Sequence, residues 1–525
     1  MKALKYLLTP FLFATYAFLS LLVNNITEVD VSAMTALLFS ILIAGLALIL
    51  LRIFVRDAEK ASIIATIAVI LIFSFGHVSN LLANISSGSV LFVVWICVFG
   101  GSTFWVLRKA NSEKLASFSR YLRIVGVILL LFPIYNLVSF GIYLSQLKGK
   151  TDNYIQQSFP MDNINRISVS KDGTPPDIYY IILDAYSRPD ILQTKLGYDD
   201  SVLSDFLEAQ GFYVARASMS NYSNTRYSLS SSLNMTHIAN LPENLDGPAQ
   251  YQRNWMLLKS ASYLVKNNLI AQILRDQGYE FVSFNTGFGE VEMTNSDHYM
   301  ISPEITNGSS PISAFDILLF NTTMGTFLNK NANRAPLESL SNDHRERILY
   351  TLAHISDFAD QEGSFFVYAH VLSPHPPFVF NAQGEATDAC IYTDTDVGRD
   401  PSCYLGQVAY LNELVMEAVN DILEKSDTPP IIIIQGDHGV NCYVQSEDIE
   451  KRVPLCFPIL NAYHFPDADY KLLYPEITPI NSFRIVLNQY FNANLPLLPD
   501  ESFFYELADG DVKFVDICKG YGYCP

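Results

Sequence analysis

The chain has 525 residues, of which 50% are hydrophobic, and a formal net charge of −19. This length exceeds one ordinary domain, and the positive mean hydropathy of +0.18 indicates that part of the chain lies in lipid. Residues 146–525 carry 24 basic and 48 acidic side chains. That balance excludes nucleic acid as a partner, because its phosphates require a basic footprint, and is typical of a solubilising surface.

Five apolar runs of about 20 residues fill the first part of the chain, and each is long enough to cross a bilayer as a helix. They cover residues 4–23, 33–55, 61–83, 88–107 and 122–145. The first run is longer than a signal-peptide core and lacks a convincing small-residue cleavage site after it, so we expect it to be retained. We therefore predict a five-span membrane domain over residues 1–145.

The distribution of lysine and arginine predicts the orientation of these spans. Three basic clusters lie on one side of the membrane: Lys2 and Lys5; Arg52, Arg56 and Lys60; and Arg108, Lys109, Lys114, Arg120 and Arg123. The alternate loops, 24–32 and 80–89, contain neither residue type. By the positive-inside rule the amino terminus is cytoplasmic, so five spans place everything after residue 145 outside the cytoplasm.

The cysteines agree with this topology, because six of the seven lie in the outer part of the chain, where conditions are oxidising. Their order suggests three local disulfides, Cys390–Cys403, Cys442–Cys456 and Cys518–Cys524, although six cysteines allow 15 connectivities. The lack of a C-x-x-C pair disfavours a cysteine metal site. The seventh cysteine, Cys97, lies in a predicted span.

The outer part of the chain is predicted to begin with a linker, residues 146–175, which is polar and ends in Gly-Thr-Pro-Pro. From residue 176 to residue 525 short apolar runs alternate with longer amphipathic ones. The expected strands are 178–183, 212–215, 279–284, 365–370, 431–434 and 455–460, and the expected helices are near 200–210, 256–277, 340–360 and 404–425. This alternation favours an α/β domain with a mostly parallel sheet sandwiched by helices.

Two of the expected strands end in a carboxylate. Asp184 follows the apolar run 178–183, and the sequence Asp437-His438-Gly439 follows a run of four isoleucines and Gln-Gly. An aspartate at such a place could instead cap the next turn or helix. The second sequence is more specific, because it offers adjacent oxygen and nitrogen ligands, with a glycine that permits a tight turn. Since ligands gather beyond the carboxyl ends of strands in open α/β sheets, we predict a metal site here.

A hydroxyl-rich stretch, Asn221–Met235, is expected to change from loop to helix, with Thr225 near the helix start. Capping the helix is the structural alternative for this threonine. Beside a metal, however, a hydroxyl becomes more acidic, and the amides of a helix start stabilise phosphate oxygens. Thr225 is therefore a candidate nucleophile, and its neighbours Asn224 and Arg226 are candidates for binding substrate.

Two histidines, His370 and His375, lie at the end of the expected strand 365–370 and just after it. His375 lies after the strand in a proline-rich loop, where it could bind a phosphoryl oxygen or protonate a leaving alkoxide. His370 is still inside the strand, where packing is the alternative to substrate binding.

The chain resembles the sulfatase-like branch of the alkaline phosphatase superfamily in the order of its motifs. These are a strand ending in Asp, a Thr nucleophile, the sequence H-x(4)-H-x-P and a strand ending in Gly-Asp-His-Gly. With five spans before an outer catalytic domain, nearly the whole chain is similar to lipoteichoic acid synthases and phosphoethanolamine transferases. The resemblance implies that Asp184, Thr225, Asp437 and His438 bind one divalent ion, Mn²⁺ or Zn²⁺. It also implies that His375 contacts substrate.

The chain departs from these families at two points. No cysteine begins the C/S-x-P/A-x-R sequence that true sulfatases need for formylglycine, which argues against ordinary sulfate-ester hydrolysis. Phosphoethanolamine transferases usually carry another histidine about a dozen residues beyond Asp-His, whereas this chain has none between His438 and His464. A second metal and an ethanolamine headgroup are therefore in question.

The resemblance implies a membrane-bound transferase, in which a metal-activated Thr225 attacks a phospholipid-type donor and a cell-envelope glycan or lipid accepts the group. The expected location is the bacterial inner membrane, crossed several times, with the catalytic domain in the periplasm. Water as the acceptor would make the protein a hydrolase, either a phosphodiesterase or a sulfuric ester hydrolase. A non-catalytic membrane scaffold or lipid-binding module is the alternative of another class.

Overall fold

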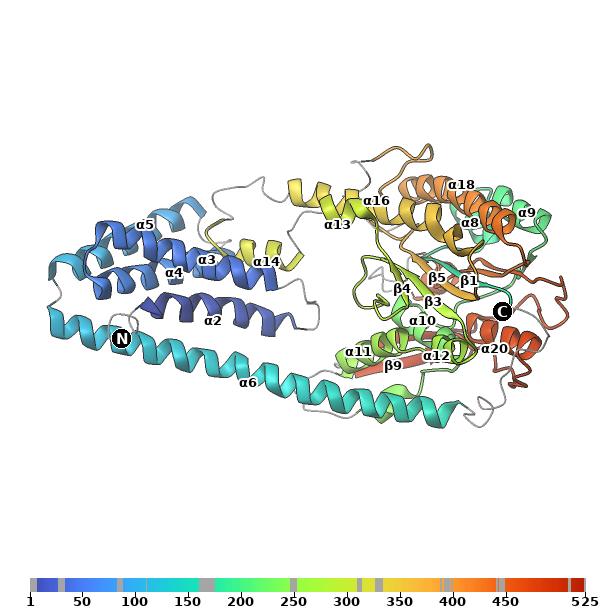
Figure 1. Ribbon diagram of the computed structural model, residues 1–525, viewed down its shortest axis with the longest axis horizontal. Coiled ribbons are helices and arrows are strands. Elements are labelled where there is room, and N and C mark those ends of the chain that lie inside the picture. Colours follow the sequence, from blue (N-terminus) through green and yellow to red (C-terminus); the bar gives the residue numbers. More distant parts are fainter. Residues whose placement is uncertain are drawn as a thin grey trace. The chain divides into compact units, whose positions relative to one another are not determined.

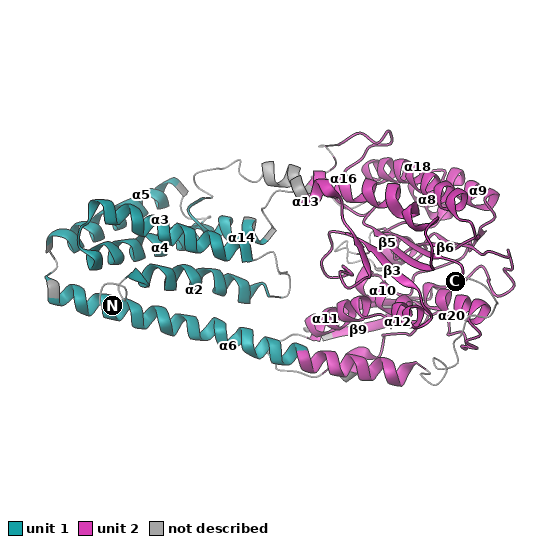
Figure 2. Cartoon of the chain, in the orientation of Figure 1, with its two compact units in different colours: residues 1–144, 310–340 teal, residues 145–309, 341–525 magenta. Residues whose placement is uncertain are grey.

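The computed structural model divides into two compact units, residues 1–144 with 310–340 and residues 145–309 with 341–525, coloured separately in Figure 2. The residues that it describes are 7–26, 34–82, 88–109, 111–159, 175–245, 253–308, 314–325, 334–387, 390, 397, 400–440, 442, 449–508 and 511–523.

The first unit consists of apolar helices. They are α2 (Thr9–Asn24), α3 (Met34–Phe54), α4 (Ala58–Leu81), α5 (Gly88–Phe104), the π-helix η2 (Trp105–Lys109) and the first part of α6 (Ser112–Ser158). Among the described residues, four helical stretches are long and apolar enough to cross a membrane, and α2, with 16 residues, is a shorter apolar helix. Each of the five runs predicted from the sequence is thus mainly helical over its described residues.

A later segment, α14 (Ala314–Thr322), packs on these helices within the same unit. The ring centroids of Phe315 and Phe18 lie 5.9 Å apart, and both residues belong to the unit's apolar core. Gly76 of α4 permits this contact, because a Cβ at that position would lie 2.3 Å from the carbonyl oxygen of Asn321. The sequence does not predict that α14 packs on these apolar helices, since nothing in its local pattern indicates which helices it contacts.

The second unit is built on a seven-stranded sheet in the order β2-β7-β6-β1-β5-β3-β4. The strands are β1 (Ile178–Leu183), β2 (Tyr213–Val214), β3 (Glu280–Phe284), β4 (His298–Met300), β5 (Phe365–Val371), β6 (Ile431–Gly436) and β7 (Asn461–His464). The five strands from β6 to β4 run parallel to one another, whereas β7 is antiparallel to both β6 and β2. The prediction of an α/β fold with a mostly parallel sheet is confirmed.

Helices cover both faces of the sheet, as Figure 1 shows. On one face lie α10 (Thr225–Asn234), α11 (Arg253–Lys266), α12 (Leu269–Asp276) and α20 (Pro479–Tyr490). On the other lie α8 (Pro189–Leu196), α9 (Ser201–Ala209), α16 (Arg334–His354) and α18 (Ser402–Lys425). Successive side chains of β1 enter the two apolar cores in turn, and all six are buried. A strand between two helix layers therefore has a continuous apolar sequence.

A two-stranded antiparallel sheet of β8 (Phe503–Ala508) and β9 (Asp511–Asp516) completes the unit. Shorter helices are η3 (Leu241–Asn244), α13 (Pro303–Gly308), η4 (Ile355–Phe358), α19 (Ile449–Cys456) and α21 (Ile517–Tyr521). The disulfides Cys390–Cys403 and Cys442–Cys456 confirm two of the three predicted pairs. Cys518 is also disulfide-bonded, and Cys524 lies outside the described residues.

One strand prediction is wrong. The segment 455–460 begins inside α19, and the strand starts only at Asn461. Between them, Pro458 and Ile459 form isolated bridges to Met219 and Ser187. A short apolar run does not distinguish a buried helix end from a strand, which accounts for the error.

Two other expected segments differ in detail. The expected linker 146–175 begins as helix, because α6 continues to Ser158. This part of α6 contacts α11, where the Thr151 hydroxyl donates to Ser260 Oγ at 3.0 Å. Residues 160–174 of that stretch lie outside the described residues. The helix expected over 256–277 is divided into α11 and α12, and Asn268 caps the second helix by accepting from the Ala271 N–H.

Candidate metal and phosphoryl-transfer site

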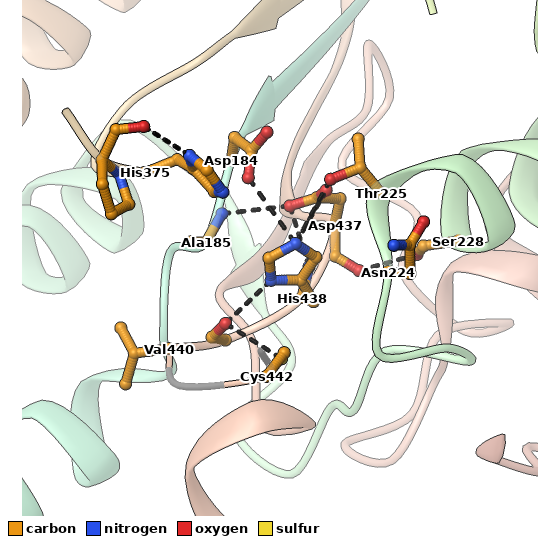
Figure 3. A network of polar contacts seen from close by, with 12 residues as sticks. Asp184, Ala185, Asn224, Thr225, Ser228, His375, Asp437, His438, Val440 and Cys442 are labelled. Carbon is orange, nitrogen blue, oxygen red and sulfur yellow. Dashed lines mark hydrogen bonds and ion pairs between the residues drawn. The ribbon is translucent and has the colours of Figure 1, made fainter. Parts of the chain in front are cut away.

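The predicted metal ligands come from the carboxyl ends of two neighbouring strands. β1 and β6 are parallel, and their register pairs Leu183 with Gly436. Asp184 and Asp437, which follow these residues, are therefore brought side by side at one edge of the sheet, and both are buried. His438 is buried beside them, as Figure 3 shows.

One oxygen of each carboxylate is already held, that of Asp437 by the turn after β1 and that of Asp184 by His370 of β5. Ala185 adopts a φ of 64°, a left-handed conformation that costs a non-glycine residue about 1–2 kcal/mol. Its N–H donates to Asp437 Oδ1 at 3.1 Å, and its carbonyl accepts from the Tyr404 hydroxyl at 2.9 Å. His370 Nε2 lies 3.2 Å from Asp184 Oδ2. The second oxygen of each aspartate is left for another partner.

His438 is oriented by its own turn. Its Nδ1 lies 2.8 Å from the carbonyl oxygen of Gly439, which accepts the Nδ1–H. The lone pair is then on Nε2, as a metal-binding histidine requires. That nitrogen lies 3.2 Å from Thr225 Oγ1, 3.7 Å from Asp184 Oδ1 and 3.6 Å from Asp437 Oδ2. Four side chains from three separate segments of the chain thus converge on one point.

Thr225 is the first residue of α10, at the helix start that the sequence predicts. The capping residue is its neighbour Asn224, whose Oδ1 accepts from the Arg226 N–H at 3.0 Å. One turn later the Ser228 hydroxyl donates to the Asp437 carbonyl at 2.6 Å, which ties the helix start to the end of β6. Because the cap is provided by another side chain, the buried Thr225 hydroxyl is not needed for that role.

The residues present fit a divalent cation. Among the described residues, Asp184 Oδ1 and Asp437 Oδ2 are buried and have no hydrogen-bond partner. Ligand atoms of these two aspartates and of His370 lie within 4.8 Å of one another. Buried carboxylate oxygens without donors require a positive charge nearby. A set of oxygen ligands with an imidazole suits Mn²⁺ or Zn²⁺.

Neighbouring charges keep the Asp184 carboxylate ionised. Burial raises the pKa of Asp184, but the imidazoles of His375, His370 and His438 outweigh burial and hold that pKa below its usual value. Burial lowers the pKa of His438, and the carboxylates of Asp437 and Asp184 outweigh burial, so that pKa is raised. An ionised carboxylate is the form that binds a metal.

A cavity of about 780 Å³ opens onto these groups. Its lining includes the predicted site residues Asp184, Asn224, Thr225, Arg226, His375 and His438. His375 lies in the loop after β5, with Nδ1 2.7 Å from the carbonyl oxygen of Pro376. His370 is not among the described lining residues; its Nε2 contacts Asp184, and it belongs to the group of three side chains that could hold an ion.

One wall of the cavity was not predicted from the sequence. Gly287 and Phe288, in the loop after β3, line it, and the Arg226 guanidinium lies 5.3 Å from the Phe288 ring centroid. Within the described part of the chain that guanidinium has no hydrogen-bond or ion-pair partner. Glu292 holds the loop by accepting from the N–H groups of Thr286 and Gly287 at 2.9 and 3.0 Å. The loop follows a predicted strand, so the rule for strand ends could have identified it.

The other unpredicted lining residues are mostly apolar or aromatic. They are Ala185, Leu258, Leu372, Pro374, Pro376, Pro377, Val397, Tyr404, Gly439, Val440, Cys442 and Tyr505. These residues come from widely separated segments. Apart from Gly439 and the prolines beside His375, which belong to the sequences noted above, no local pattern distinguishes them from ordinary core residues.

A family model described as Sulfatase matches residues 176–483, more than half of the chain, and includes every predicted site residue. No protein with a curated description matches the chain. Three similar solved structures are the C-terminal periplasmic domain of EcEptC from Escherichia coli, the phosphoethanolamine transferase EptA from Neisseria meningitidis and the lipoteichoic acid synthase LtaP from Listeria monocytogenes. Their sequence identities are 11%, 11% and 15%, and their TM-scores are 0.38, 0.38 and 0.37. The matches cover 68%, 92% and 67% of this chain and 97%, 94% and 85% of those chains.

Proposed function

Because the chain belongs to the sulfatase family, we propose that it is a metal-dependent enzyme in which Thr225 carries a phospho-substituent from a donor to an acceptor. The observation that carries this proposal is the convergence at Thr225 Oγ1. It lies 3.2 Å from His438 Nε2, which itself lies 3.7 and 3.6 Å from the unpartnered oxygens of Asp184 and Asp437. A hydroxyl with a purely structural role does not require such surroundings.

Asp184, Asp437 and His438 would hold one divalent ion, Mn²⁺ or Zn²⁺, beside Thr225. When bound, the ion would lower the pKa of the threonine hydroxyl and neutralise charge on the phosphoryl oxygens. His370 supports this set by its contact with Asp184 Oδ2, at 3.2 Å.

In the first half-reaction the Thr225 oxygen bonds to phosphorus, and the bond between phosphorus and the leaving alkoxide oxygen breaks. The hydroxyl proton of Thr225 passes to solvent, and a protonated His375 donates a proton to the departing alkoxide. In the second half-reaction an acceptor hydroxyl attacks the phosphothreonine and releases its proton, while the Thr225 oxygen leaves and is protonated again.

The groups around Thr225 suit a phosphorylated lipid. Asn224 and the half-buried Arg226 lie at the start of α10, where a guanidinium and free helix amides bind phosphoryl oxygens. Apolar side chains such as Leu258 and Phe288 line the same cavity and would contact the rest of the donor. Four candidate spans in the chain favour a phospholipid donor and a cell-envelope glycan or lipid acceptor, because confinement to a membrane raises the effective concentration of such substrates.

The disulfides support an extracytoplasmic location for the catalytic unit. Cys390–Cys403 and Cys442–Cys456 both belong to it, and disulfides persist where the environment is oxidising. We accordingly place the protein in the bacterial inner membrane with this unit in the periplasm, as the basic clusters of the first 145 residues also favour.

The test is intact-mass analysis of the full-length protein in detergent with mixed bacterial phospholipids and Mn²⁺ or Zn²⁺. Wild type and Thr225→Ser retain a hydroxyl and are expected to gain a covalent adduct whose mass identifies the transferred group. Thr225→Ala is expected to gain none. An adduct on Thr225→Ala would exclude this nucleophile, and a wild type that binds neither metal nor lipid phosphate would favour a scaffold role.

A second arm separates transfer from hydrolysis, which is the alternative function. The adduct-bearing protein is incubated with buffer alone or with a cell-envelope extract. Loss of the adduct only with extract, with the same added mass recovered on a lipid or glycan, supports a transferase. Equal loss in buffer supports a phosphodiesterase.

A further inference from the structure

The turn that carries Asp437 and His438 is tied covalently to the end of α19. Cys442 forms a disulfide with Cys456. Cys442 Sγ lies 3.3 Å from the Gly439 carbonyl oxygen, and the Gly439 N–H donates to the Cys456 carbonyl at 2.6 Å. Both residues of the disulfide therefore contact Gly439, and the first of these contacts is drawn in Figure 3.

Gly439 has little freedom in this position. A Cβ there would lie 2.2 Å from the Leu455 carbonyl oxygen and 3.1 Å from the carbonyl oxygens of Cys456 and Pro458. These are backbone atoms, so they cannot move aside as a flexible side chain could. The Gly439 carbonyl is in turn the acceptor for His438 Nδ1–H, at 2.8 Å. The direction of His438 Nε2 therefore depends on where the backbone from 455 to 458 holds this carbonyl.

We propose that the Cys442–Cys456 disulfide is a positioning element for His438: it holds the Gly439 carbonyl, and through that carbonyl the imidazole, in the orientation that binds the metal. This inference rests on the metal site of the proposed function. Groups that hydrogen-bond the second nitrogen of a metal-binding histidine typically change metal affinity by about 10–100-fold when they are lost. Here the backbone carbonyl cannot be removed, but the covalent bond that locates it can.

The chain provides a matched control. Cys390–Cys403 spans 13 residues of sequence and Cys442–Cys456 spans 14, so the two disulfides constrain the unfolded chain to a similar extent. Cys442 lines the cavity, whereas neither Cys390 nor Cys403 belongs to the described lining. A loss of metal affinity that follows from general destabilisation should appear in both double variants.

The experiment measures the dissociation constant for Mn²⁺ by competition with a chelator, using the full-length protein in detergent. Mn²⁺ is the probe because free thiols bind it less readily than they bind Zn²⁺. In Cys442→Ala/Cys456→Ala the constant is expected to rise about 10–100-fold, while Cys390→Ala/Cys403→Ala stays near wild type. Circular dichroism establishes that each variant is folded.

Chemical reduction gives a second, independent arm. A water-soluble phosphine supplies two electrons and becomes its oxide by taking oxygen from water, whose hydrogens complete the two cysteine thiols. After the reagent is removed, wild type and Cys390→Ala/Cys403→Ala should bind Mn²⁺ more weakly than before, and Cys442→Ala/Cys456→Ala should not change further. If the Cys442→Ala/Cys456→Ala variant does not fold, this arm decides the question together with Cys518→Ala, because the reagent also reduces the disulfide of Cys518 and that variant must still weaken on reduction.

Three results would overturn the proposal. The folded Cys442→Ala/Cys456→Ala variant could bind Mn²⁺ as wild type does, both double variants could weaken equally, or reduction of wild type could leave the affinity unchanged. In each case wild type still binds the ion, so the proposed function survives. If wild type binds neither Mn²⁺ nor Zn²⁺, the metal site of the proposed function and this positioning role fail together.

Discussion

The ends of β1 and β6 supply the same kind of ligand but are supported in different ways. After β1, the turn at Ala185 is held by polar side chains. Tyr404 donates to its carbonyl, and the next residue, Tyr186, donates through its hydroxyl to the buried Asp200 at 3.0 Å. Asn412 also donates to Asp200, at 2.6 Å. This support contains a titratable group and no covalent bond.

After β6, the turn at Gly439 is held by close backbone packing and by the disulfide of Cys442 with Cys456. This support contains a covalent bond and depends on one glycine. The comparison teaches that a carboxylate at a strand end identifies a candidate ligand, whereas the stability of its position is decided by partners elsewhere in the chain. The two supports should also respond to different perturbations.

The largest expected effect comes from the ligands themselves. Asp184→Asn and Asp437→Asn should each weaken Mn²⁺ binding by at least about 100-fold and reduce turnover by at least about 1,000-fold, because each removes a charged ligand. In the metal-free protein the two variants should differ. Asp184 has a lowered pKa, so its ionised form stabilises the folded state above its ordinary pKa, and Asp184→Asn should lower the thermal midpoint at neutral pH.

Asp437→Asn should change the metal-free midpoint less, because the asparagine amide oxygen can replace Asp437 Oδ1, which accepts from the N–H groups of Ala185 and His438 at 3.1 and 2.9 Å. Thermal unfolding in excess chelator measures both variants. Equal destabilisation by the two substitutions would show that the surroundings of the carboxylates are equivalent, contrary to this comparison.

An intermediate effect is expected from two separate substitutions, Gly439→Ala in one turn and Ala185→Gly in the other. Gly439→Ala places a Cβ 2.2 Å from a backbone oxygen, so the turn must shift, at a cost of about 1–3 kcal/mol and with loss of metal affinity. Ala185→Gly has a matched size change in the opposite direction. Because Ala185 has a φ of 64°, glycine relieves strain there, and stability should change by less than about 1 kcal/mol.

Thermal unfolding and chelator competition on the full-length protein compare these two variants. If Ala185→Gly weakened metal binding as strongly as Gly439→Ala, the rigidity of the β1 turn would be as important as that of the β6 turn.

The last expected effect is a pH dependence that arises from the support of the β1 turn. Burial raises the pKa of Asp200 from 3.8 to about 6, so the folded protein binds this proton more tightly than the unfolded chain does. The stabilisation is fully present below the unfolded pKa and is lost as the pH rises through about 6. The change is at most about 3 kcal/mol. The midpoint of Asp200→Asn should therefore fall less than that of wild type between about pH 4 and pH 7.

The control for this prediction is Cys442→Ala/Cys456→Ala, which alters the other turn and should keep the wild-type difference between the two pH values. An Asp200→Asn variant whose midpoint follows the wild-type pH profile would show that this carboxyl does not titrate in the expected range.

The sequence by itself determined the α/β class, the five apolar helical runs, two disulfide pairs and the residues Asp184, Thr225, Asp437 and His438 as one candidate group. These features depend on short-range patterns: continuous apolar runs, a polar residue directly after a strand, and a helix start. Once the two strands are parallel neighbours, their carboxyl ends must meet at one edge of the sheet. Local patterns therefore suffice to predict the candidate ligands.

Only the tertiary structure decided the rest. It showed Asn224 as the cap in place of Thr225, the Phe288 wall, the support of His438 by the Gly439 carbonyl, and the packing of α14 with the membrane helices. It also moved the last strand to Asn461. Each of these features depends on which distant segments pack together. The identity of a single residue does not specify its long-range partner, because many different partners could bury the same side chain or accept the same hydrogen bond.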